Sequence, residues 1–167
     1  MAWVLRTGQS SDLEAVLQLW ARAEAEPSRT DDVDSLSRLI EHDPSALIVA
    51  EDGRSIVGSV IAGWDGWRGS IYRLVVAPSH RRLGLGRRLL LEAEARLAAQ
   101  RCVRLQAIVV ETESKAMGFW HASGWEQRST VRDSCTVDRH PRRDDPEGGV
   151  TVNVASCSDA WRTHLHG

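Results

Sequence analysis

The most informative segment of the chain spans residues 76–90 and has the sequence Val76-Ala77-Pro78-Ser79-His80-Arg81-Arg82-Leu83-Gly84-Leu85-Gly86-Arg87-Arg88-Leu89-Leu90. An apolar run at 71–76 is typical of a strand, which Pro78 ends because proline has no N–H to donate to a ladder. Two glycines, Gly84 and Gly86, then lead into apolar residues at helical spacing. The segment therefore predicts a strand, a glycine-containing loop and an amphipathic helix in direct succession.

The junction between this loop and this helix has the properties of an anion site. The first turn of a helix presents N–H groups without intrahelical partners, and the helix dipole adds roughly half a positive charge there. Glycines allow a ligand to approach the backbone closely, and arginines at 81, 82, 87 and 88 add charge at the same end. Such a junction suits a phosphate or pyrophosphate, and arginines that simply face solvent are the alternative interpretation. The dinucleotide fingerprint is excluded because Leu89 replaces its third glycine, and a P-loop is excluded because no Gly-Lys-Ser/Thr follows.

Upstream of residue 71 the chain alternates between helical and strand-like patterns. Ser11 and Glu14 have the spacing of a capping box, and Val16 and Trp20 belong to the helical stripe that follows. Asp52-Gly53 is a strong signal for a tight hairpin. We expect a strand at 3–6, a helix at 13–21, a loop at 24–30, a helix at 33–40 and paired strands at 46–50 and 55–63.

Downstream of the central helix, a continuous apolar run at 105–110 is typical of a strand whose two faces are both covered. Gly124 suits the C-terminal end of a second short helix. The remaining elements that we expect are this helix at 115–123, a strand at 125–131, a loop at 140–149 and a last strand at 151–155.

The composition limits the classes of protein that fit. A chain of 167 residues with 42% hydrophobic and 26% charged residues fits one globular domain with its own core. No apolar run approaches the roughly 18 residues of a membrane span, and the N-terminus lacks the pattern of a signal peptide, so we expect a cytoplasmic location. The net charge of -2 gives no electrostatic case for nucleic acid or an anionic membrane.

The segment at 76–90 resembles the central motif of the GCN5-related N-acetyltransferase (GNAT) family. That motif, Arg/Gln-x-x-Gly-x-Gly/Ala, is matched by Arg81, Gly84 and Gly86. The resemblance covers roughly residues 3–131, and further matches after the fifth strand are Ala116, Phe119, Gly124 and Trp125. It implies an α+β fold with a mixed, mostly antiparallel sheet, flanked by helices and splayed between its fourth and fifth strands. We therefore expect an acetyltransferase domain at 1–132 and a C-terminal tail at 133–167.

The resemblance also implies the cofactor and the reaction. Acetyl-CoA is the expected acyl donor, and a primary amine is expected to attack the thioester directly in a ternary complex. Main-chain N–H groups at the end of the fourth strand are expected to polarise the thioester oxygen and to pair with the pantetheine, and the loop at 82–87 is expected to hold the pyrophosphate. The expected cofactor-binding residues are Leu74, Val75, Val76, Arg81, Arg82, Leu83, Gly84, Leu85, Gly86, Arg87 and Phe119.

Proton transfer is the step that the resemblance does not assign. Where many family members have Asn, Tyr and Glu, this chain has Glu113, Trp120 and Ile108. The candidates for catalysis are Glu111, just past the strand at 105–110, and Tyr72, on the preceding strand. Further candidates are Glu24 and Glu26, in a loop that often lines the acceptor site in this family, and a water chain without a dedicated side chain. For each carboxylate or phenol, a structural or solvated role is the alternative.

Other side chains carry weaker signals. Cysteine and histidine residues in the tail have irregular spacing for zinc, so we expect no metal site. Cys102 is expected to be a buried small hydrophobe. Trp64 and Trp67 flank a hairpin tip, where packing is the default and a place in the acceptor site is the alternative.

The expected partner is an amine-bearing small molecule or protein acceptor, with no nucleic acid or membrane partner, and the chain is expected to be a monomer or homodimer. A catalytically silent acetyl-CoA-binding module is the alternative function, because the familiar proton-transfer groups are missing. A nucleic-acid patch formed by the arginines is disfavoured by the overall charge.

Overall fold

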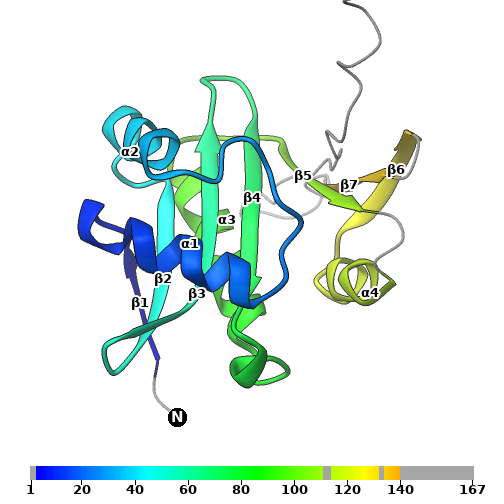
Figure 1. The fold of residues 1–167 in the computed structure, drawn as a ribbon. Coiled ribbons are helices and arrows are strands. Elements are labelled where there is room, and N and C mark those ends of the chain that lie inside the picture. Colours follow the sequence, from blue (N-terminus) through cyan, green and yellow to red (C-terminus); the bar gives the residue numbers. More distant parts are fainter. Residues whose placement is uncertain (1–2, 111–113, 132–133, 140–167) are drawn as a thin grey trace, which may run out of the picture.

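The computed structural model of the chain describes residues 3–110, 114–131 and 134–139. They form one seven-stranded sheet with the strand order β1-β2-β3-β4-β5-β7-β6, and helices cover both of its faces (Figure 1). The strands are β1 (Val4–Thr7), β2 (Leu47–Asp52), β3 (Ser55–Trp64), β4 (Gly69–Val76), β5 (Leu105–Val110), β6 (Glu126–Val131) and β7 (Ser134–Arg139). The helices are α1 (Leu13–Arg22), α2 (Val33–His42), α3 (Leu85–Ala99) and α4 (Ser114–Ala122), with short 3-10 turns at Ser10–Asp12 and Pro78–His80. The predicted α+β fold with a mostly antiparallel sheet is confirmed, because only β4 and β5 pair in parallel among the described strands.

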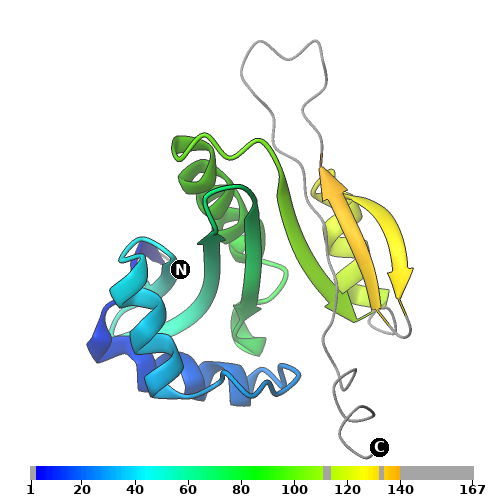
Figure 2. The same cartoon turned by 90° about the horizontal axis from the view of Figure 1, so that it is seen from above.

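Two apolar clusters hold the helices to the sheet. Figure 2 shows α1 and α2 on one face of the central strands and α3 on the opposite face. On the α3 face, Leu89 and Leu90 are almost fully buried, and on the α1 face Val16 and Leu19 are completely buried. A Cβ atom at Gly58 of β3 would lie 2.8 Å from Cδ1 of Leu89, so glycine at this position permits α3 to pack closely on the sheet. Each buried leucine contributes about 1.5–3 kcal/mol, so α3 is firmly anchored.

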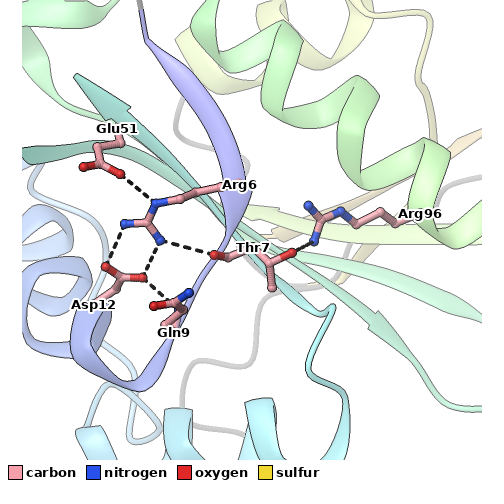
Figure 3. A network of polar contacts seen from close by, with 6 residues as sticks. All are labelled: Arg6, Thr7, Gln9, Asp12, Glu51 and Arg96. Carbon is pink, nitrogen blue, oxygen red and sulfur yellow. Dashed lines mark hydrogen bonds and ion pairs between the residues drawn. The ribbon is translucent and has the colours of Figure 1, made fainter. Parts of the chain in front are cut away.

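A polar network fixes the entry into α1 (Figure 3). Arg6 of β1 donates to Asp12 at 2.7 Å and to Glu51 of β2 at 2.6 Å. The hydrogen bonds from Arg6 hold the pKa of the Asp12 carboxyl below its ordinary value. The capping box lies at Gln9 and Asp12, around the 3-10 turn, so the box predicted two residues later was wrong. The capping box lies earlier than predicted because the 3-10 turn precedes the helix and takes over the capping role.

The strands β4 and β5 separate after a short parallel ladder. Their pairing begins at Gly69 and Leu105 and ends at Ile71 and Ala107, although β4 continues to residue 76 and β5 to residue 110. In Figure 2, β5 turns away from β4 toward α4, β6 and β7. This confirms the splay that the family resemblance implied. A Cβ atom at Gly69 would lie 2.3 Å from Cδ2 of Leu105, so any other residue at this position would force the Leu105 side chain to move.

The sheet extends past residue 132, where we had placed the end of the acetyltransferase domain. β7 lies between β5 and β6 and pairs with both, so residues 134–139 belong to the sheet. This strand was missed because it contains only Cys135 and Val137 as apolar residues, too few for a clear strand pattern. The strand predicted at 151–155 lies outside the described residues.

Candidate active site

The loop between β4 and α3 has two residues in the left-handed region. Arg82 has φ 61° and Gly84, the N-cap of α3, has φ 84°. No side chain caps the helix, and its first turn contains no acidic residue. A Cβ atom at Gly84 would meet nothing within 4 Å, so glycine is needed there for its backbone conformation and not for space. The local sequence therefore produces an open helix N-terminus, as the glycine pattern predicted.

The main-chain N–H groups of residues 82–87 are available to a ligand. Within the described part of the chain, none of them has a hydrogen-bond acceptor, and the first bond back into this loop is from Arg88 N–H to the carbonyl oxygen of Gly84. Arg82 and Arg87 are exposed beside these donors. Unpaired N–H groups, the helix dipole and two guanidinium groups all favour an anion at this place.

Arg81 has a different position from the one that its place in the motif suggested. Its Nε donates to the carbonyl oxygen of Val76 at 3.2 Å, and its Nη2 donates to the carbonyl oxygen of Ala23 at 2.9 Å. Both acceptors are main-chain atoms, one at the end of β4 and one at the end of α1. Arg81 therefore fixes the loop between the end of β4 and the end of α1.

Phe119 of α4 lies close to the glycine loop. A Cβ atom at Gly86 would lie 3.4 Å from Cε2 of Phe119 and 3.7 Å from Cγ2 of Val76. α4 belongs to the part of the sheet beyond the split, whereas Gly86 and Val76 belong to the part before it. The expected cofactor residues Val76, Gly86 and Phe119 therefore meet across the split.

A β-bulge gives the end of β4 its orientation. Tyr72 pairs with Ile61 and Val75 pairs with Ser59, so two residues of β4 lie opposite the single residue Val60. The first of these two, Arg73, is in the left-handed region with φ 51°. Its carbonyl oxygen accepts a hydrogen bond from the Ser59 hydroxyl at 3.2 Å.

The bulge directs main-chain N–H groups into the split. Ala77 N–H donates to Val57 of β3, and alternation along the strand therefore turns the N–H groups of Leu74 and Val76 toward the opposite edge, which β5 has left. In a trans peptide, N–H points opposite to C=O, so the bond from Ser59 to the Arg73 carbonyl also fixes the Leu74 N–H. Ser59 is fully buried and accepts a hydrogen bond from Trp20 Nε1 at 2.8 Å. Sequence analysis did not identify this arrangement, and its only local signals are a serine and an arginine inside otherwise apolar strands.

A hollow of about 240 Å³ lies at the start of β4, beside the point where β4 and β5 separate. Tyr72 is 46% exposed and lines it, which places the tyrosine candidate next to the split. Asp65 accepts hydrogen bonds from the main-chain N–H groups of Arg68 and Trp67, and these bonds hold its pKa below the ordinary value. The lining residues are Gly63, Trp64, Asp65, Arg68, Ser70, Tyr72 and Gln106.

The structure brings together only some of the candidates for catalysis. Glu111 and Glu113 lie outside the described residues. Trp120 is only 6% exposed and packs against Trp125 with ring centroids 4.1 Å apart, so it is a core residue. Glu26 lies in the segment between α1 and α2, where its carbonyl oxygen accepts a hydrogen bond from Arg73.

The residues with weaker signals in the sequence are Cys102, Trp64 and Trp67. Burial raises the pKa of the Cys102 thiol, and this cysteine is 4% exposed, as expected for a small core residue. Trp64 lines the hollow, whereas Trp67 is 69% exposed with the Arg68 guanidinium 4.0 Å from its ring centre. No group of three or more possible metal ligands occurs among the described residues, and none of their helices is long and apolar enough to span a bilayer.

Comparison with known proteins agrees with this geometry. A family model described as the acetyltransferase (GNAT) family matches residues 13–125. A protein named acetyltransferase from Yersinia enterocolitica is 35% identical over 127 residues, which cover 76% of this chain and 90% of that protein. The structure of Ard1 from Thermoplasma volcanium has a TM-score of 0.69 at 17% identity and covers 82% of this chain and 96% of that chain. The PaiA N-acetyltransferase from Thermoplasma acidophilum, solved in complex with coenzyme A, has a TM-score of 0.67 at 15% identity and covers 81% of this chain and 96% of that chain.

The family model and the Yersinia relative agree on one class of protein, an acetyltransferase. The chain belongs to the acetyltransferase (GNAT) family. The resemblance inferred from the 76–90 segment is therefore confirmed, and so is the assignment of the protein as an N-acetyltransferase.

Proposed function

We propose that the protein transfers the acetyl group of acetyl-CoA to a primary amine by direct attack within a ternary complex. The observation that supports this most is a series of main-chain donors with no hydrogen-bond partner among the described residues, which runs from the β5-facing edge of β4, at Leu74 and Val76, into the first turn of α3. In acetyl-CoA the thioester, the pantetheine amides and the pyrophosphate follow one another in the same order. The donors therefore match the cofactor from its acyl end to its phosphates.

In this proposal, different residues of the site bind different parts of the cofactor. Residues 74–76 hold the thioester and the pantetheine, residues 82–87 hold the pyrophosphate, and Phe119 borders the cofactor next to Gly86. Arg81 supports the loop through main-chain carbonyl groups and does not need to touch the phosphates. The exposed guanidinium groups of Arg82 and Arg87 add charge around the pyrophosphate.

The chemical step follows from the position of the Leu74 N–H. The amine nitrogen, after losing a proton, attacks the carbonyl carbon of the thioester, and the carbonyl electrons move to the oxygen. The Leu74 N–H stabilises this oxyanion, and one such donor contributes about 10²–10³ in rate. The oxyanion then collapses, the C–S bond breaks and the coenzyme A thiolate leaves, while the nitrogen gives up a second proton and the thiolate takes up a proton to become the thiol. The bound pair must be held within reacting distance, which the two sides of the split provide.

The hollow beside Tyr72 is the proposed place of the acceptor. It lies on the first residues of β4, directly before the bulge that directs the Leu74 N–H. The hollow is lined by one carboxylate, Asp65, and one guanidinium group, Arg68, and the Asp65 carboxylate is the group there that can pair with a positively charged amine. The acceptor is accordingly a small-molecule amine or an amino group of a protein. Tyr72 is the candidate for proton transfer among the residues that the structure describes, and a role for Glu111 stays a prediction. The cytoplasmic location and the monomeric or homodimeric state also stay predictions.

A thiol-release assay with acetyl-CoA and a panel of amines tests the proposal. The panel contains diamines and polyamines, free lysine, and peptides with free N-termini, and mass spectrometry identifies the acetylated product. We expect coenzyme A release that depends on one class of amine, with a gain of one acetyl group on nitrogen. Tight binding of coenzyme A without turnover on any amine would contradict the proposal and support a catalytically silent binding module. With an active amine, Tyr72→Phe should lower kcat by about 10²-fold and change the pH profile if the phenol transfers the proton.

A further inference from the structure

Arg73 is an arginine in the bulge of β4, and its side chain leaves the sheet toward α1 and α2. Its Nη1 donates to the carbonyl oxygen of Glu26 at 2.7 Å, and its Nη2 pairs with the carboxylate of Asp31. The guanidinium carbon lies 4.9 Å from the ring centre of Trp20. Only 17% of the side chain is exposed. A left-handed backbone is unfavourable for arginine, so the surrounding structure must hold Arg73 in place.

The segment between α1 and α2, residues 23–32, is attached to the proposed cofactor side at two points. Arg81 of the glycine loop binds the carbonyl oxygen of Ala23, and Arg73 of the bulge binds Glu26 and Asp31. Figure 1 shows this segment running along β4 on its way to α2. The Asp31 carboxylate also accepts the Ser28 N–H at 2.9 Å, so one side chain closes the turn of the segment and binds Arg73.

We propose that Arg73 is a positioning residue that couples this segment to the thioester-binding peptide of β4. The peptide between Arg73 and Leu74 directs the proposed oxyanion donor, and the side chain of the same arginine holds residues 26–31. Binding of coenzyme A along β4 therefore orders the segment between α1 and α2, which Arg73 holds against β4 directly after Tyr72 of the acceptor hollow. This inference rests on the proposed function for the assignment of the donor and acceptor sides.

Three variants isolate the side chain of Arg73 from its backbone. Arg73→Gly removes the guanidinium while glycine retains the left-handed conformation without steric cost. Asp31→Asn removes the charge of the partner and leaves β4 unchanged. Arg101→Gly is the matched control, because Arg101 is an exposed arginine with φ 60° in the turn between α3 and β5, away from the segment.

Amide hydrogen exchange of residues 26–31, measured with and without coenzyme A, is the main readout. In the unchanged protein we expect coenzyme A to slow exchange in this segment. In Arg73→Gly and in Asp31→Asn we expect exchange about tenfold faster and no response to coenzyme A, and the double variant should be no worse than either single one. Residues near Ala23 should remain protected because Arg81 still holds them. Arg101→Gly should behave like the unchanged protein.

Steady-state kinetics with the best amine of the panel provides a readout that loss of stability alone would not give. We expect Arg73→Gly to raise the KM for the amine about tenfold while the Kd for coenzyme A changes less than about twofold. Unchanged exchange in Arg73→Gly, or a loss of coenzyme A affinity as large as the rise in KM, would overturn the inference. If the unchanged protein turns over no amine, the proposed function fails, and the exchange experiment still decides whether Arg73 couples the two sides.

Discussion

Replacing Gly84 by Asp and by Asn tests the anion site with two side chains of nearly equal shape that differ by one charge. Both residues tolerate the left-handed backbone better than other side chains, and nothing lies within 4 Å of the position that a Cβ would occupy. We therefore expect both variants to fold, with a loss of about 1 kcal/mol in the free energy of unfolding. Aspartate at the start of α3 should be no less stable than asparagine in the free protein, because the helix dipole favours its charge.

The difference between the two variants should appear when coenzyme A binds. A carboxylate about 6 Å from a phosphate charge costs about 1–3 kcal/mol at an effective dielectric constant between about 20 and 60. Isothermal titration of coenzyme A should therefore give a Kd about 5- to 150-fold higher for Gly84→Asp than for Gly84→Asn. The ratio should shrink as salt is added, because ions screen exposed charges.

Two results would refute the reasoning. Kd values for the folded Asp and Asn variants that both equal the Kd of the unchanged protein would mean that no phosphate lies at the start of α3. Weakening of both variants to the same degree at every salt concentration would mean that the side chain blocks the site by its volume, and not by its charge. Truncated ligands give a further control, since pantetheine, which lacks the pyrophosphate, should bind both variants equally.

Three further predictions concern the bulge and the stability of the fold. Ser59→Ala removes the hydroxyl that holds the bulge peptide, so kcat should fall about 10- to 100-fold with a smaller change in the Kd for coenzyme A, and an unchanged kcat would argue against this role. Asp12→Asn should cost about 1–2 kcal/mol of unfolding free energy at neutral pH, measured by urea denaturation. Arg6 lowers the folded-state pKa of Asp12, so the contribution of Asp12 to the unfolding free energy is complete above its unfolded pKa of about 4 and is lost as the pH falls through its folded pKa. The unfolding free energy of Asp12→Asn should therefore fall less steeply with decreasing pH than that of the unchanged protein. An equally steep fall would contradict this role. Gly69→Ala should lower the unfolding free energy by about 1–3 kcal/mol, because the new methyl group meets Leu105, and a change below about 0.5 kcal/mol would show that the strands can move apart there.

The parts of the site that sequence predicted are those whose physics is local. The open N-terminus of α3 depends on Gly84, on the absence of an acidic first turn and on the helix that follows, and all three are visible within 15 residues. The hairpin at Asp52-Gly53 and the positions of α2 and β5 follow from equally local signals. The splay of β4 and β5 was predicted through the family resemblance, because its cause lies in the pairing of distant strands.

The parts that sequence did not predict depend on register or on contacts between distant segments. The bulge at Arg73 requires two residues opposite one, and nothing in the run at 69–76 shows which residue is unpaired. The carbonyl partners of Arg81 belong to distant segments, so the sequence could not show that this arginine supports the loop, and its contact with phosphate stays a prediction. β7 was missed because its strand pattern is weak, although it pairs with both of its neighbours.

The bulge also sets the phase of every residue that follows it in β4. Ile71 packs on the α3 face, and because of the extra residue Leu74 and Val76 also pack on that face, while Val75 packs toward α1. If the bulge were lost at unchanged chain length, Arg73 would pair with Val60 and Leu74 with Ser59, which would exchange the two faces for the rest of the strand and turn its edge N–H groups toward β3. In an alignment of relatives, a gap at this single position therefore identifies a chain that has lost the bulge and the Arg73 side chain but keeps the faces of β4 on both sides of it.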